Sequence, residues 1–362
     1  LRLSGTSLPP NVLLMAKLVT LCFLLTQWRS LPRPYLPFVH IFDRLGSPTL
    51  VQRVLKVAFL ISALLLFWNR WVRASCIVLS AVIGAAVLSS RVYFGNNRVF
   101  SACVLLLAGL QQTGQGPWLI RSQVILVYLG AGLNKLLDPD WRSGQFFETW
   151  TSAVPHHQRL RSHIPFSPRH LSRLVSWLVI AVELWLVVGF SRKRLHRAAV
   201  WTGTLYHTAL LVDTGSTFTM FYFAMLSAYL AFVEWPSGPV SVEYDSRLRP
   251  LMRAWALWSR LDPDHVIQWR PSPAQHVGVS ATTSGHVYQG WSAVTALALR
   301  QPANYLAGAT LLSLLRPSRH MRWLALAAVG ACSPVLQPVG DLALRLVARG
   351  PVADNRFPGR AR

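Results

Sequence analysis

One lysine near the end of an apolar stretch is the residue best placed to do chemistry. The stretch Gln123–Trp141 (QVILVYLGAGLNKLLDPDW) is predicted to be a helix that ends at the turn signal Asp138-Pro139-Asp140. A helix places Tyr128 and Lys135, seven residues apart, on one face. Insertion of a lysine at mid-bilayer costs about 2.5–3.5 kcal/mol, and a lysine held there can become a base at neutral pH. The alternative, which the residues alone favour, is an ammonium that reaches the membrane surface.

Two further ionisable residues stand inside later apolar stretches. Glu183 could pair with Lys135 or with an arginine, in which case its role is structural. His207 could line a cavity or serve only helix packing. We expect no metal site, because His156, His157, His163 and His170 alternate with arginines and show no zinc spacing.

The composition is that of a membrane protein. Of 362 residues, 52% are hydrophobic and only 14% are charged, yet the formal net charge is +23. The arginines lie between apolar segments instead of on one domain. We therefore expect loops that contact anionic lipid, with the bilayer as partner, and no nucleic-acid binding.

Residues 1–236 are predicted to form a polytopic all-α transmembrane bundle of about eight spans. The basic turn Arg192–Arg197 is placed in the cytoplasm by the positive-inside rule, and so is the C-terminal part of the chain. If every predicted span crosses the membrane, the basic connector Arg29–Lys56 lies outside, which conflicts with the positive-inside rule. A missing helix or a re-entrant connector would remove the conflict. The predicted spans are Val12–Trp28, Val57–Trp68, Ala74–Leu88, Phe100–Leu110, the Lys135 helix, Leu171–Phe190, Ala198–Leu211 and Thr217–Phe232.

Residues 237–362 have the pattern of a small α/β domain. After Pro236, the pattern predicts the order strand, helix, strand, strand, helix. The expected strands are Val240–Tyr244, His265–Trp269 and Gly285–Tyr288, and the expected helices are Pro250–Leu261 and Trp291–Leu299.

The segment AGLNKLLDPDW resembles the corresponding stretch of the horizontally transferred transmembrane (HTTM) domain, the family that includes vitamin K-dependent γ-glutamyl carboxylase. In the carboxylase, a lysine at the place of Lys135 is the base that activates vitamin K hydroquinone. The segment from Tyr206-His207 to Glu234-Trp235-Pro236 is also similar to the carboxylase. Asn96-Asn97-Arg98 resembles a third segment of the carboxylase, in which a histidine stands at the place of Arg98. An arginine can bind an anion at this position but cannot accept a proton.

The resemblance implies a multi-pass protein of the cell membrane that acts on a lipid-soluble quinol or another amphipathic substrate. Lys135, Glu183 and His207 would be catalytic, and the cofactor would be a vitamin K-like quinol. The second hypothesis is a non-catalytic accessory protein for export or maturation of a secreted peptide. Substrate binding is assigned to Asn97, Arg98, Tyr128, Asn134 and Trp141.

The C-terminal part resembles the DCC family of thiol-disulfide oxidoreductase-like proteins, which are thioredoxin-like. The resemblance rests on VEYDSRLRPL and on the segments that follow it. Leu248 and Leu251 stand at the two cysteine positions of the family motif. The resemblance therefore implies a degenerate cytoplasmic domain without thiol exchange.

Overall fold

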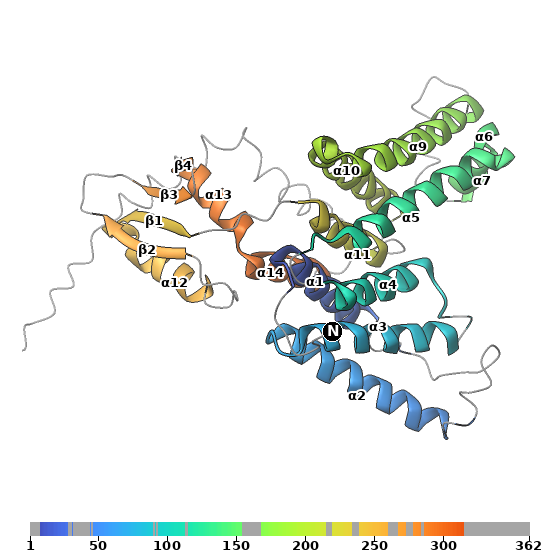
Figure 1. Cartoon of the computed structure of the whole chain (residues 1–362). Coiled ribbons are helices and arrows are strands. Elements are labelled where there is room, and N and C mark those ends of the chain that lie inside the picture. The colour runs from blue at the N-terminus through green and yellow to red at the C-terminus, as the bar shows by residue number, and fades with distance from the viewer. Residues whose placement is uncertain are drawn as a thin grey trace, which may run out of the picture. The chain divides into compact units, whose positions relative to one another are not determined.

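The computed structural model describes residues 8–27, 31, 44, 46–89, 91, 93–112, 115–153, 168–214, 219–233, 239–259, 267–272, 278–283 and 286–314. The chain forms two compact units, Leu1–Glu234 and Trp235–Arg362. The first unit is helical and the second contains a small mixed sheet, as Figure 1 shows.

A helix lies at each of the predicted spans. Among the described residues, three helical segments are long and apolar enough to cross a membrane, Pro48–Phe67, Val72–Ser89 and Arg169–Ser191. Three apolar helices are shorter, Pro10–Thr26, Asn96–Leu110 and Met220–Phe232. These helices indicate a membrane protein, and the count of eight spans stays a prediction. The helices are α1 (Pro10–Thr26), α2 (Pro48–Phe67), α3 (Val72–Ser89), α4 (Asn96–Leu110), α5 (Trp118–Leu137), α6 (Pro139–Ser143), α7 (Gln145–Ala153), α9 (Pro168–Ser191), α10 (His196–Thr214) and α11 (Thr219–Tyr229).

The predicted turn after Lys135 is a helix junction. Asp138 ends α5 and caps α6, because its side chain accepts a hydrogen bond from the Asp140 N–H at 2.9 Å. Gly144, at φ 84°, ends α6. α6 and α7 then pack against the start of α9, while α5 and α9 run side by side (Figure 1).

The core of the helical unit lies between α1, α3, α4, α5, α9 and α11, and α2 is peripheral. On α2 large apolar side chains are exposed, among them Leu50, Val54 and Ile61. An exposed apolar helix face of this length is expected where lipid, not water, is the solvent.

The second unit is built on a four-stranded sheet in the order β2-β1-β3-β4. β1 pairs in parallel with β2 and antiparallel with β3, and β3 pairs antiparallel with β4. The elements are β1 (Val240–Asp245), α12 (Arg249–Ser259), β2 (Ile267–Ser272), β3 (Val279–Thr283), β4 (His286–Gln289), α13 (Trp291–Arg300) and α14 (Pro302–Leu314).

The three predicted strands correspond to β1, β2 and β4, and β3 is a fourth strand that the sequence did not predict. Its sequence VSATT carries small residues, so its apolar alternation is weak. The tertiary structure nevertheless buries Val279 and Ala281 in the core of the second unit, where α13 packs against β3. Of the two leucines at the expected cysteine positions, Leu248 lies in the core and Leu251 is exposed.

Candidate functional site

Helix α5 presents two different faces to its neighbours. Tyr128, Gly132 and Lys135 follow one another at spacings of four and three residues and face α9 and α10. Val127, Gly130 and Asn134 lie on another face, which borders a pocket beside α4. The predicted site residues on α5 are therefore divided between two places.

On the first face, Lys135 forms an ion pair with Glu183 of α9. The ammonium Nζ donates to both carboxylate oxygens, at 2.8 Å to Oε1 and 2.7 Å to Oε2. The side chains are 18% and 6% exposed, respectively. The Tyr206 hydroxyl donates to Oε1 of Glu183 at 2.9 Å, and the Lys135 ammonium lies 5.0 Å from the Trp141 ring centroid. Lys135 or an arginine was expected as the partner of Glu183, and the structure shows that the partner is Lys135.

Gly132 makes this pair possible. A Cβ on Gly132 would lie 3.0 Å from Leu184 Cδ2 and 3.5 Å from the Glu183 Cβ. The glycine therefore lets α5 and α9 approach closely at the level of the carboxylate. Three residues further along α5, Lys135 reaches the same carboxylate.

His207 belongs to a second buried polar cluster. Its Nε2 lies 2.7 Å from the hydroxyl of Tyr128, which is also hydrogen-bonded to the hydroxyl of Tyr229. The ring of Tyr128 stacks on Phe190 with centroids 5.9 Å apart. His207 is 2% exposed, and its Nδ1 has no hydrogen-bond partner among the described residues.

The two clusters differ in what they can do. In the ion pair Lys135 is a donor, so it cannot accept a proton while the pair is closed. In the Tyr128–His207–Tyr229 cluster each group can donate or accept, and hydroxyl and imidazole groups in sequence can pass a proton. Of the two clusters, only the one at His207 contains groups that can both donate and accept a proton as they stand.

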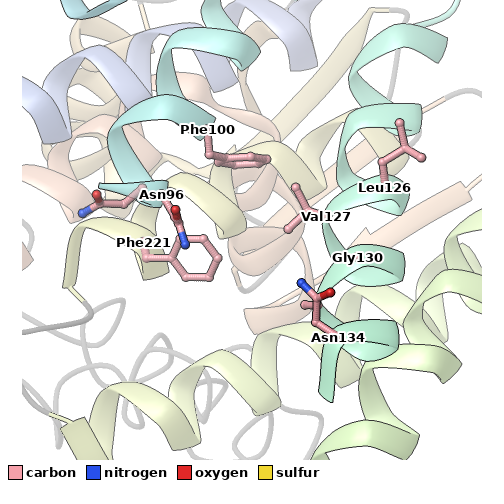
Figure 2. A pocket seen from close by; sticks show the side chains of 9 residues that line it. Asn96, Phe100, Leu126, Val127, Gly130, Asn134 and Phe221 are labelled. Carbon is pink, nitrogen blue, oxygen red and sulfur yellow. The ribbon is translucent and has the colours of Figure 1, made fainter. Parts of the chain in front are cut away.

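A pocket of about 600 Å³ lies beside the second face of α5. Figure 2 shows Phe100 and Val127 at its apolar walls, with Asn134 one turn beyond Gly130. The lining residues are Asn96, Asn97, Phe100, Leu126, Val127, Gly130, Ala131, Asn134 and Phe221. Polar carboxamides therefore accompany apolar walls, and none of the nine lining side chains is charged.

Arg98 is held away from Lys135. Its guanidinium donates to Gln27 Oε1 at 2.9 Å through Nη2 and to the Tyr93 carbonyl oxygen through Nη1. The guanidinium also lies 3.8 Å from the Tyr93 ring centroid. These contacts join the start of α4 to the end of α1. They account for the arginine structurally, and the role of substrate binding stays a prediction.

Sequence reasoning named His207, Tyr128 and Asn134 but missed Tyr229 and Phe221. Tyr229 lies in a mostly apolar segment, TMFYFAMLSAY, that contains other aromatic residues, and nothing in the sequence distinguishes Tyr229 from them. The histidines His156, His157 and His163 lie outside the described residues.

The chain is similar to sporulation-delaying protein SdpB of Bacillus subtilis (strain 168). The two are 31% identical over 94 residues, which are 25% of this chain and 29% of the relative. No family model and no solved structure matches. Together with the apolar helices, the similarity indicates an integral membrane protein with a region related to SdpB. The matched region spans less than a third of that relative.

Proposed function

We propose that the helical unit binds an amphipathic molecule of the quinol class in the pocket between α4, α5 and α11. The observation that carries this proposal is a pocket of about 600 Å³ whose walls combine Phe100 and Phe221 with the amides of Asn96, Asn97 and Asn134. Small-molecule sites commonly have this composition, with apolar walls and a few convergent polar groups.

The lining favours a neutral, flat ligand. Aromatic rings such as Phe100 and Phe221 pack well against another ring. A carboxamide both donates and accepts, so it suits a hydroxyl as well as a carbonyl oxygen. A charged ligand would find no opposite charge among the nine lining residues.

A carboxylase-like reaction with Lys135 as base would require a change in the Lys135–Glu183 ion pair. The Lys135–Glu183 pair would have to open and the ammonium would have to lose its proton before Lys135 could accept one. Lys135 also lies on the α9 side of α5 instead of among the pocket residues. The geometry therefore supports ligand binding more directly than it supports this reaction.

The second candidate is the non-catalytic accessory role in export or maturation of a secreted peptide. Carboxamides at Asn96 and Asn134 suit peptide groups as well as hydroxyls. The similarity to a protein named for delaying sporulation, not for a carboxylation, also favours this candidate.

We further propose that the chain is multi-pass in the cell membrane, with residues 237–362 as a cytoplasmic, thioredoxin-like domain without thiol exchange. The mixed sheet and its strand–helix–strand beginning, β1-α12-β2, support this assignment. Leucine at 248 and 251 supports the absence of thiol chemistry.

Labelling of the purified full chain in lipid nanodiscs with a photoreactive, isoprenoid-tailed naphthoquinone tests the binding proposal. Asn134→Leu and Asn96→Leu should each reduce specific labelling by about three- to tenfold, which corresponds to the loss of about one hydrogen bond. Asn97 is a poorer probe, because its side-chain oxygen accepts from the Arg98 N–H at 2.9 Å.

The control is the double variant Lys135→Met/Glu183→Gln, which removes the ion pair on the other face of α5. Its labelling should stay within twofold of the parent. The proposal is overturned if labelling is lost in this control and retained in the asparagine variants, because the ligand would then sit at Lys135.

A further inference from the structure

We propose that Phe221 is a partition between the pocket and His207, and that the hydroxyl or carbonyl group of the ligand reaches Nδ1 of His207 past this ring. The inference takes the pocket of the proposed function as the ligand site. It adds His207 as a binding residue and Phe221 as the residue that controls access to it.

Phe221 contacts both sides of this partition. It is one of the residues that line the pocket, where its ring centroid lies 6.3 Å from that of Phe100. Its ring also meets His207 edge to face, with centroids 5.5 Å apart and an interplanar angle of 67°. In Figure 2 the Phe221 ring lies at the edge of the pocket, below Phe100. The Phe221 side chain therefore touches both the pocket and the imidazole of His207.

His207 has one satisfied and one unsatisfied nitrogen. Nε2 is hydrogen-bonded to the Tyr128 hydroxyl at 2.7 Å. The two nitrogens of an imidazole point in widely different directions, so Nδ1 is directed away from Tyr128. Nδ1 is buried without a hydrogen-bond partner among the residues described. A buried polar atom without a hydrogen bond is unfavourable, so a ligand atom that reaches Nδ1 has a favourable contact to make.

The cluster behind His207 lets Nδ1 serve either redox form of a quinol-class ligand. If the Tyr128 hydroxyl donates to Nε2, Nδ1 carries the ring proton and can donate to a carbonyl oxygen. If Nε2 donates to Tyr128, Nδ1 accepts and suits a hydroxyl. Tyr128 can reverse its role because its hydroxyl also has Tyr229 as a partner. The site therefore fits a neutral molecule that presents a hydroxyl or carbonyl on a flat ring.

Rotation of the partly buried Phe221 ring would connect the pocket with His207. Phenylalanine moves between a few discrete rotamers, so the partition has distinct closed and open positions. In the structure the ring is closed, and His207 is 2% exposed.

Carbethoxylation of His207 by diethyl pyrocarbonate measures this access in the full chain in nanodiscs, with the modified peptide quantified by mass spectrometry. In the parent the reaction should be slow. Phe221→Ala should raise its rate at least tenfold. The matched control is Phe100→Ala, which removes a ring of the same size from the same pocket. It should leave the rate within twofold of the parent.

The thiol of Cys76, which is completely buried, reports whether the bundle stays intact. It should remain unreactive to a membrane-permeant maleimide in both variants. If Phe221→Ala exposes Cys76, the same comparison is made with Phe221→Leu, and the same criterion applies. Equal rates for the Phe221 and Phe100 variants with Cys76 protected would overturn the partition.

A tailed naphthohydroquinone at saturating concentration tests the ligand contact separately. It should slow the modification of His207 in Phe221→Ala at least fivefold. If His207 becomes reactive but the hydroquinone gives no protection, the contact with Nδ1 is refuted. If the parent is also not labelled by the photoreactive quinone, the proposed function falls while the partition stands.

Discussion

Lys135 and Glu183 face each other across the α5–α9 interface, with the ammonium within 2.8 Å of both carboxylate oxygens. The carboxylate also accepts from Tyr206, so most of its hydrogen-bonding capacity is used. Desolvation of two charges offsets much of their attraction, so such a pair adds little net stability to the fold. Its main effect is to set the relative position of the two helices.

Breaking this pair should destabilise the helical unit. Glu183→Gln and Lys135→Met each leave one uncompensated charge, and we expect a loss of about 2–3 kcal/mol, less than for a fully buried pair. The double variant should recover at least half of the loss, because no unpaired charge remains. Thermal unfolding in detergent, followed by tryptophan fluorescence, measures the three variants. Simple additivity of the two losses would contradict the structural role.

Lys135→Arg separates the structural role from the base hypothesis. Arginine keeps the charge and can still pair with Glu183, but it cannot act as a neutral-pH base. If Lys135 is only a partner of Glu183, Lys135→Arg should retain quinone labelling within twofold and most of the stability. A variant that folds and is labelled but loses a phenotype of the parent would restore the base hypothesis.

Gly203 should not tolerate alanine. A Cβ there would lie 2.5 Å from the Tyr229 hydroxyl oxygen and 2.7 Å from its Cζ. Overpacking of this kind typically costs about 1–3 kcal/mol, and we expect Gly203→Ala to lower the unfolding midpoint accordingly. Gly84→Ala is the control, because nothing lies within 4 Å of the added Cβ. Gly203→Ala with Tyr229→Phe should lose less than the sum of the single variants, since the nearest clashing atom is gone.

His196, in the basic turn outside the predicted spans, should make stability fall in acid. Burial and then the Arg121 charge lower the pKa of His196 from its ordinary value of 6.5. The unfolded chain therefore binds a proton at a higher pH than the folded chain does, so stability is fully present above about pH 6.5 and declines as pH falls toward the lowered pKa. His196→Gln should make the unfolding midpoint depend less on pH between pH 7.5 and 5, which thermal unfolding at a series of pH values measures.

The orientation prediction is checked with reporter fusions after Ser216 and after Pro239. By the positive-inside rule, we predict that the basic turn Arg192–Arg197 and the C-terminal unit lie in the cytoplasm and that the connector after α10 lies outside. The two fusions should report opposite sides of the membrane. Both reporters on one side would contradict this topology.

The sequence by itself determined where the long apolar helices lie and indicated a membrane protein. Within a membrane no water is available to hydrogen-bond the backbone, so a long apolar run forms a helix that satisfies its own backbone groups. The pattern of apolar residues is therefore sufficient to locate these helices. It also determined that Tyr128 and Lys135 share a face of α5, because helical periodicity is a local property.

Only the tertiary structure decided what each face meets. Neighbouring residues Asn134 and Lys135 point about 100° apart on a helix, and packing turns one toward the α4 pocket and the other toward Glu183. Arg98 is engaged by Gln27, 71 residues earlier in the chain. Periodicity tells which side chains share a face, but not which distant helix covers it. That depends on the close approaches that residues such as Gly132 and Gly203 permit.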